Sequence, residues 1–63
     1  MKRKALLREL AKIAESKDLK LELDRHGGNH DMYRIGREVF FVGRHADIPE
    51  HTAMGTIKKA RSI

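Results

Sequence analysis

The sequence predicts an α+β fold of α-β-β-β-α order, in which a three-stranded antiparallel sheet carries both helices on one face. Three observations lead to this prediction. The chain has 63 residues, a length that allows one small domain spanning 1–63. Apolar residues recur at helical spacing near both ends of the chain. Between these ends, three short segments suited to strands are separated by glycine-containing turns.

The first expected element is a helix from about Lys2 to Glu15. Charged side chains occupy one side of it, and Ser16-Lys17-Asp18 ends it. Its apolar residues follow the i, i+3, i+4, i+7 spacing of a single helix face: Leu6, Leu7, Leu10, Ile13 and Ala14.

The first expected strand is marked by Leu19, Leu21 and Leu23, which alternate with polar residues. This period-two pattern is typical of a half-buried strand. Gly27-Gly28-Asn29 follows and predicts a turn, because glycine and asparagine accept positive φ at little cost.

The second and third strands are expected over His30–Ile35 and Val39–Val42, with a tight connection at Gly36 and Arg37. Parallel pairing would need a long crossover connection, so three strands joined by short turns must form an antiparallel meander.

The last expected element is a helix that begins at Glu50 or Thr52, after a loop containing Pro49. Its apolar stripe consists of Ala53, Met54, Ile57 and Ala60. Each helix has one apolar stripe to bury, so both helices should cover the same face of the sheet and leave the other face open.

Strand alternation also predicts which side chains face the helices. Tyr33 and Ile35 should point to the core, whereas His30, Met32 and Arg34 should share the opposite face. The adjacent rings of Phe40 and Phe41 cannot both point inward, so one of them should face solvent or a partner.

The charge of the chain is basic and unevenly distributed. There are 14 Lys+Arg against 9 Asp+Glu, a formal net charge of +5. Residues 1–20 carry +4, residues 21–50 carry −2 and residues 51–63 carry +3. Basic ends suit a polyanion such as nucleic acid, because clustered cations release counterions from phosphates. Two solvated helix faces would produce the same pattern.

Several classes of function are excluded by composition. A chain this short has no room for a large cofactor-binding fold, and it has no cysteine for disulfides or thiolate metal sites. Its four histidines form no HxH or HExxH pattern, so neither a metal nor a cofactor is expected. No apolar run exceeds four residues, which predicts no membrane span and a cytoplasmic protein.

His30 is the candidate for chemistry, because its imidazole follows a glycine turn and can change charge near neutral pH. Its surroundings resemble those of the HicA family of bacterial toxins over about residues 3–61. The residues that carry the resemblance are Gly28-Asn29-His30-Asp31, Tyr33, Val39, Arg44-His45, Ile48 and Glu50-x-Thr52-Ala53-x-x-x-Ile57-x-Lys59.

The resemblance implies a double-stranded-RNA-binding-like fold and a ribonuclease that cuts messenger RNA without a metal. It also implies a HicB-type antitoxin that covers the site in a heteromeric toxin–antitoxin complex, with His30 as the catalytic residue. Two positions depart from the family pattern. Many members have a second histidine where this chain has Asp31, and a proline where it has Gly43. The first departure removes a candidate for a second proton-transfer residue.

In metal-free RNA cleavage the ribose 2′-hydroxyl attacks its own phosphate, and we expect His30 to accept the hydroxyl proton. Arg34, on the same strand face, is expected to offset the charge that builds on the phosphate. The reaction also needs an acid that protonates the leaving group, and Tyr33, His26 and His45 remain alternatives for this role. The expected contacts to the RNA backbone come from Lys2, Arg3, Lys4, Lys58, Lys59 and Arg61.

Two other functions are compatible with the same residues. One is a non-catalytic module that binds structured RNA by its shape. The other is an interaction domain whose open sheet face binds a protein.

Overall fold

The computed structural model describes all 63 residues. The element order is α1 (Arg3–Ser16), β1 (Leu21–His26), β2 (His30–Ile35), β3 (Glu38–Gly43) and α2 (Glu50–Arg61). The predicted α-β-β-β-α order is therefore confirmed. The first helix lies one residue later than expected at each end.

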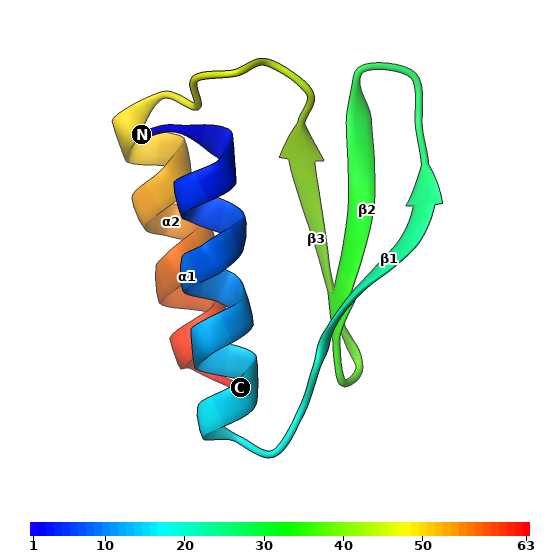
Figure 1. Cartoon of the computed structure of the whole chain (residues 1–63), viewed down its shortest axis with the longest axis vertical. Helices are drawn as coiled ribbons and strands as arrows, with labels where there is room; N and C mark the ends of the chain where they lie inside the picture. The colour runs from blue at the N-terminus through cyan, green and yellow to red at the C-terminus, as the bar shows by residue number, and fades with distance from the viewer.

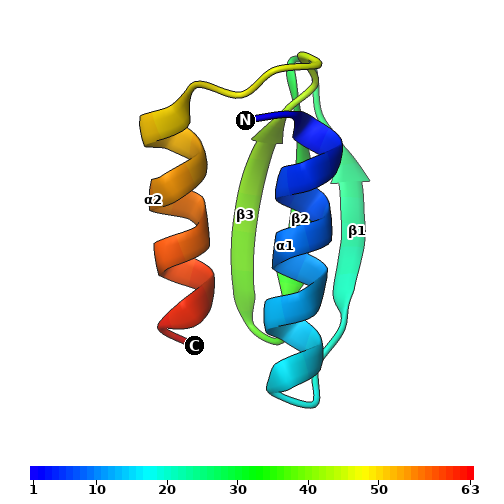
Figure 2. The same cartoon turned by 60° about the vertical axis from the view of Figure 1, so that its left-hand side comes forward.

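The three strands form one antiparallel sheet of order β1-β2-β3. Both helices cover the same face of this sheet, and no element covers the other face (Figures 1 and 2). The β1–β2 loop, the start of α1 and the start of α2 lie at one end of the molecule, and the β2–β3 turn lies at the other (Figure 1). This layered arrangement is the one predicted from the two apolar helix stripes.

The core lies between the sheet and the two helices. Ile35, Phe40 and Val42 supply the sheet side of it. The helices and the β3–α2 loop supply the rest: Leu6, Leu10, Ala14, Ile48, Ala53, Ile57 and Ala60. Ala14, Ala53 and Ala60 are completely buried, and side chains this small allow the two helices to pack closely.

A left-handed turn ends α1. The N–H of Leu19 donates to the carbonyl of Ala14 (2.9 Å), and the N–H of Asp18 donates to that of Glu15 (3.1 Å). These are the two hydrogen bonds of a Schellman motif. Asp18 occupies the left-handed position, with φ of 59°, where glycine is most common.

The expectation of a half-buried first strand was wrong in two respects. β1 begins at Leu21, and Leu19 lies in the preceding loop, where it packs against the core. Within β1 only Leu21 is partly buried, and Leu23 is 46% exposed. β1 and β3 are both edge strands, but β3 carries the buried Phe40 and Val42, whereas little of the chain covers Leu23 on β1. No helix of the protein has the length and apolar character needed to cross a lipid bilayer.

Candidate functional site

His30 is exposed and opens β2, directly after the β1–β2 loop. It pairs with Gly43 across the sheet. Its neighbours Asp31 and Ile35 are buried on the helix side, so alternation places His30 on the open face, as predicted. A Cβ at Gly43 would lie 3.8 Å from Cδ2 of the imidazole, so the glycine leaves this side of the ring uncovered.

The loop before His30 is held by two backbone hydrogen bonds. The N–H of Gly27 donates to the carbonyl of His30 (2.8 Å), and the N–H of Arg44 donates to that of Asn29 (3.2 Å). A Cβ at Gly27 would overlap the His30 carbonyl oxygen, whereas a Cβ at Gly28 would meet nothing. Gly27 is therefore the glycine that this loop requires on steric grounds.

A β-bulge at Asp24 determines what lies beside His30. Leu23 pairs with Tyr33, but the next paired residue of β1 is Arg25, opposite Met32. One extra residue in a strand reverses the face of every side chain beyond it. The bulge therefore places Arg25 on the open face and turns His26 toward the helices.

Arg25, Met32 and Phe41 form one row across the open face, because Met32 pairs with both of its neighbours. His30 lies two residues before Met32 and is diagonal to both Arg25 and Phe41. Such diagonal neighbours are about 7–8 Å apart. Phe41 is 63% exposed while Phe40 is buried, which confirms that one of the two rings faces outward. Sequence reasoning did not identify Arg25, since strict alternation assigns it to the opposite face.

Arg34 shares the open face with His30 but is not close to it. Four residues along a strand correspond to about 13 Å. The Nη2 group of Arg34 also donates to Asp24 (3.3 Å). The expectation that Arg34 acts with His30 on one phosphate therefore disagrees with the structure, in which Arg25 is the nearer arginine of this face.

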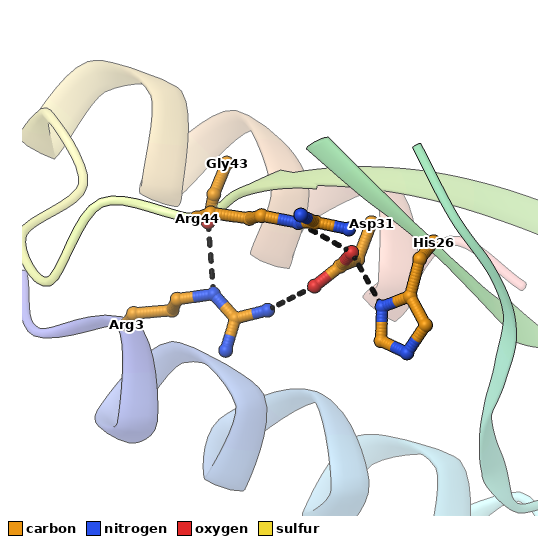
Figure 3. Close-up of polar contacts among 5 residues, drawn as sticks. All are labelled: Arg3, His26, Asp31, Gly43 and Arg44. Carbon is orange, nitrogen blue, oxygen red and sulfur yellow. Dashed lines mark hydrogen bonds and ion pairs between the residues drawn. The ribbon is translucent and has the colours of Figure 1, made fainter. Parts of the chain in front are cut away.

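On the helix side of the same strand, Asp31 accepts three hydrogen bonds of 2.9 Å (Figure 3). The donors are Arg3 Nη2, Arg44 Nε and His26 Nδ1. Arg3 Nε donates in addition to the Gly43 carbonyl (2.8 Å). These contacts, which we call the Asp31 cluster, join α1, β1, β2 and the segment after β3.

The pKa of the Asp31 carboxyl is lowered, chiefly by the hydrogen bond from His26 and further by the hydrogen bond and charge of Arg44; burial opposes the shift. An ionised carboxylate only accepts hydrogen bonds, so His26 must carry a proton on Nδ1. In the resemblance to the HicA family, Asp31 lies within the motif Gly28-Asn29-His30-Asp31, at a position where many members have a second histidine. Its buried position gives it a different role, which is to hold the end of the sheet against α1.

The predicted RNA-binding residues do not form one surface. Lys2, Arg3, Lys4 and Arg8 surround a depression of about 460 Å³ at the start of α1. Two of these residues already form ion pairs within the chain. Arg3 pairs with Asp31, and Lys2 Nζ lies 3.3 Å from Asp47 Oδ1. Residues 58–61 lie in the last turn of α2, at the opposite end of the molecule from the β1–β2 loop (Figure 1).

Of the three basic residues in the last turn of α2, Lys59 contacts other parts of the chain. Lys59 donates to the Val39 carbonyl (2.7 Å) and lies 4.8 Å from the centre of the Phe40 ring. Lys58 and Arg61 are exposed. None of the three lies beside His30, so the structure does not combine this group with the candidate catalytic residue.

Tyr33, His26 and His45 differ in their positions relative to His30. Tyr33 packs against the core, and His26 is bonded to Asp31 on the helix side. His45 is exposed and lies two residues beyond Gly43, the partner of His30. No group of three or more His, Cys, Asp or Glu side chains is arranged to hold a metal ion.

Comparison of the chain with protein-family models, with curated proteins and with solved structures finds no match.

Proposed function

We propose that the protein is a toxin ribonuclease of the HicA type, which cuts messenger RNA with His30 as general base. The observation that carries the proposal is the position of His30. Its imidazole is exposed at the start of β2, on an uncovered sheet face, and is diagonal to the free cation Arg25. A ribose phosphate can approach this face without displacing any part of the chain.

The proposed reaction is a transesterification. The neutral imidazole of His30 takes the proton of a ribose 2′-hydroxyl, and the 2′-oxygen attacks the adjacent phosphorus. The bond from phosphorus to the 5′-oxygen of the next nucleotide breaks, which leaves a 2′,3′-cyclic phosphate. Arg25 offsets the charge that develops on the phosphate oxygens.

The departing 5′-oxygen needs a proton, and His45 is our candidate for its donor. Of the three alternatives left open by the sequence, it alone is neither packed against the core nor bonded to Asp31. A base of this kind contributes about 10²–10⁴-fold to the rate, and a positioned acid contributes on the same scale.

We further propose that a HicB-type antitoxin neutralises the protein by covering the open face in a heteromeric complex. The exposed Phe41 ring supports this, because a large apolar side chain on an uncovered sheet face suits burial by a partner. In this proposal the partner and the RNA compete for the surface around His30.

The test is incubation of the purified protein with a labelled RNA in EDTA, beside the variants His30→Ala and His51→Ala. His51 is an exposed histidine in the first turn of α2 and serves as the matched control. We expect His30→Ala to lose about 10²-fold or more of the rate and His51→Ala to retain it. DNA of the same sequence should remain intact, since it has no 2′-hydroxyl.

Full cleavage by a folded His30→Ala variant would exclude His30 as the catalytic residue. If the parent binds RNA stably and cuts none, the non-catalytic RNA-binding module replaces the nuclease. In cells, the proposal predicts growth arrest on expression and rescue by co-expression of the antitoxin.

A further inference from the structure

We propose that the open sheet face beside His30 contains a stacking subsite for one base of unpaired RNA, with the Phe41 ring as its platform. The choice of RNA as the occupant rests on the proposed function. The subsite itself rests on the row formed by Arg25, Met32 and Phe41.

The Phe41 ring is available to a ligand. It is 63% exposed, more than the other exposed large apolar residues, which are Leu23, Met54 and Ile63. No helix or loop covers this face of the sheet (Figures 1 and 2). Met32 and Val39, its neighbours on the same face, are partly buried and leave an apolar surface around the ring. A planar base can therefore lie on the ring without any rearrangement of the chain.

The charge beside the ring favours an anionic ligand. Arg25 is exposed, and it makes no ion pair or side-chain hydrogen bond within the chain. The acids of this face both lie beside Arg34. Glu22 is its cross-strand partner, and Asp24 accepts its hydrogen bond. The end of the face near His30 thus combines a free guanidinium, an imidazole and an aromatic ring.

A nucleotide matches this combination. Its base can stack on Phe41 while its phosphate lies near Arg25 and its ribose near His30, since both diagonals are about 7–8 Å long. A protein partner would need a carboxylate and an apolar group in the same arrangement. A second copy of this chain would bring the same cations to the face, and two chains that each carry a net charge of +5 repel one another. A second copy is therefore a poorer match than a nucleotide.

The subsite also restricts the form of RNA that is bound. A base inside a duplex has both faces covered by its neighbours, so only an unstacked base can lie on Phe41. Stacking tolerates every base, because each presents a π face. The inference is therefore selectivity for single-stranded RNA, with little preference for sequence.

The test uses the absence of tryptophan from the chain. In the variant Phe41→Trp the indole is the sole tryptophan and reports directly on stacking. The probe is a single-stranded 2′-O-methyl oligonucleotide, which cannot be cleaved because it has no free 2′-hydroxyl. We expect the probe to quench the fluorescence of Phe41→Trp. Met54→Trp, which replaces a 52% exposed residue of α2, should not be quenched.

A second measurement separates stacking from simple apolar contact. Phe41→Leu keeps an apolar side chain without a ring, and we expect it to bind the probe about 5- to 30-fold more weakly than the parent. Phe41→Tyr should bind like the parent, and binding of a blunt duplex should be the same for all three proteins. Unchanged single-strand affinity in Phe41→Leu, an unquenched Phe41→Trp or absence of probe binding by the parent would each overturn the subsite.

These results are independent of cleavage. If RNA is not cut but binding depends on the ring, the subsite stands and the nuclease fails. If RNA is cut and Phe41→Leu binds the probe as the parent does, the nuclease stands and the subsite fails.

Discussion

Arg3, the first residue of α1, donates a 2.9 Å hydrogen bond to Asp31 on β2, 28 positions later in the chain. The same guanidinium donates to the carbonyl of Gly43 on β3. One side chain therefore joins α1 to the central strand β2 and to the edge strand β3 at this end of the sheet. The backbone of His30 adjoins both contacts, since His30 precedes Asp31 in β2 and pairs with Gly43, while its side chain lies on the opposite face of the sheet.

The first prediction concerns the charge of Asp31. Asp31→Asn removes the charge of the one buried group of the cluster, the carboxylate to which the partly exposed Arg3 and the exposed Arg44 both donate, so we expect a clearly lower Tm. Asp24→Asn is the matched control, because it removes one partly exposed ion pair with Arg34, worth about 0–1 kcal/mol. Thermal unfolding of the three proteins measures the difference. Equal losses in the two variants would contradict a structural role for the Asp31 cluster.

The second prediction concerns pH. The pKa of Asp31 in the folded protein is below its ordinary value of 3.8. The stabilisation from its ionised form is therefore complete above that value and is lost as the pH falls toward the folded pKa. Urea unfolding between pH 7 and pH 3 should show a steeper loss of stability below about pH 4 in the parent than in Asp31→Asn. Two parallel curves would show that Asp31 does not contribute to acid sensitivity.

The third prediction concerns the two glycines before His30. A side chain at Gly27 collides with the carbonyl of His30, so Gly27→Ala should cost about 1–3 kcal/mol. Gly28→Ala has open space and no positive φ to accommodate, so it should be neutral or stabilising by a few tenths of a kcal/mol. Urea denaturation of both variants gives the comparison. The reverse order would mean that the loop adopts another conformation in solution.

The fourth prediction concerns the end of α1. Asp18 has a φ of 59°, which is costly for any residue with a Cβ and free for glycine. Asp18→Gly should therefore raise the free energy of unfolding by about 0.5–1 kcal/mol. Asp18→Ala should lower it, since alanine tolerates this region less well than aspartate. Effects of the same sign in both variants would argue against the left-handed turn.

The fifth prediction concerns the arginine beside His30 and rests on the proposed RNA binding. Arg25→Gln should weaken binding of single-stranded RNA and reduce the slope of log affinity against log salt by about 0.7, the contribution of one phosphate contact. Lys58→Gln, at the far end of the molecule, should change the slope less. A larger effect at Lys58 would place the RNA on α2 and away from His30.

Regular patterns explain why much of the fold could be predicted. The helical stripe of Leu6, Leu10 and Ala14 and the alternation of Tyr33 and Ile35 each report burial on one side of one element. The turns between the strands are too short for parallel pairing, so these patterns are compatible with only a few arrangements of the helices and strands. They led to the correct element order, to one outward-facing ring of the Phe40–Phe41 pair and to an accessible His30.

In the first strand, the alternation of residues does not predict burial or facing correctly. Its leucines predict a half-buried strand, but burial depends on what lies over a strand, and at the edge of this sheet little covers Leu23. The bulge at Asp24 is a relation between β1 and β2, set when their hydrogen bonds form. A residue count within β1 therefore assigns Arg25 and His26 to the wrong faces.

The sequence alone thus determined the architecture and the exposed histidine, because local periodicity is governed by burial of one face of each element. Only the tertiary structure decided which charged groups surround that histidine. Arg3, Asp31 and Arg44 meet because α1 packs against the end of the sheet, and Arg25 shares the face of His30 because of a one-residue shift between strands. Contacts between residues so distant in the chain leave no periodic signal, since each depends on the packing of the elements that carry it.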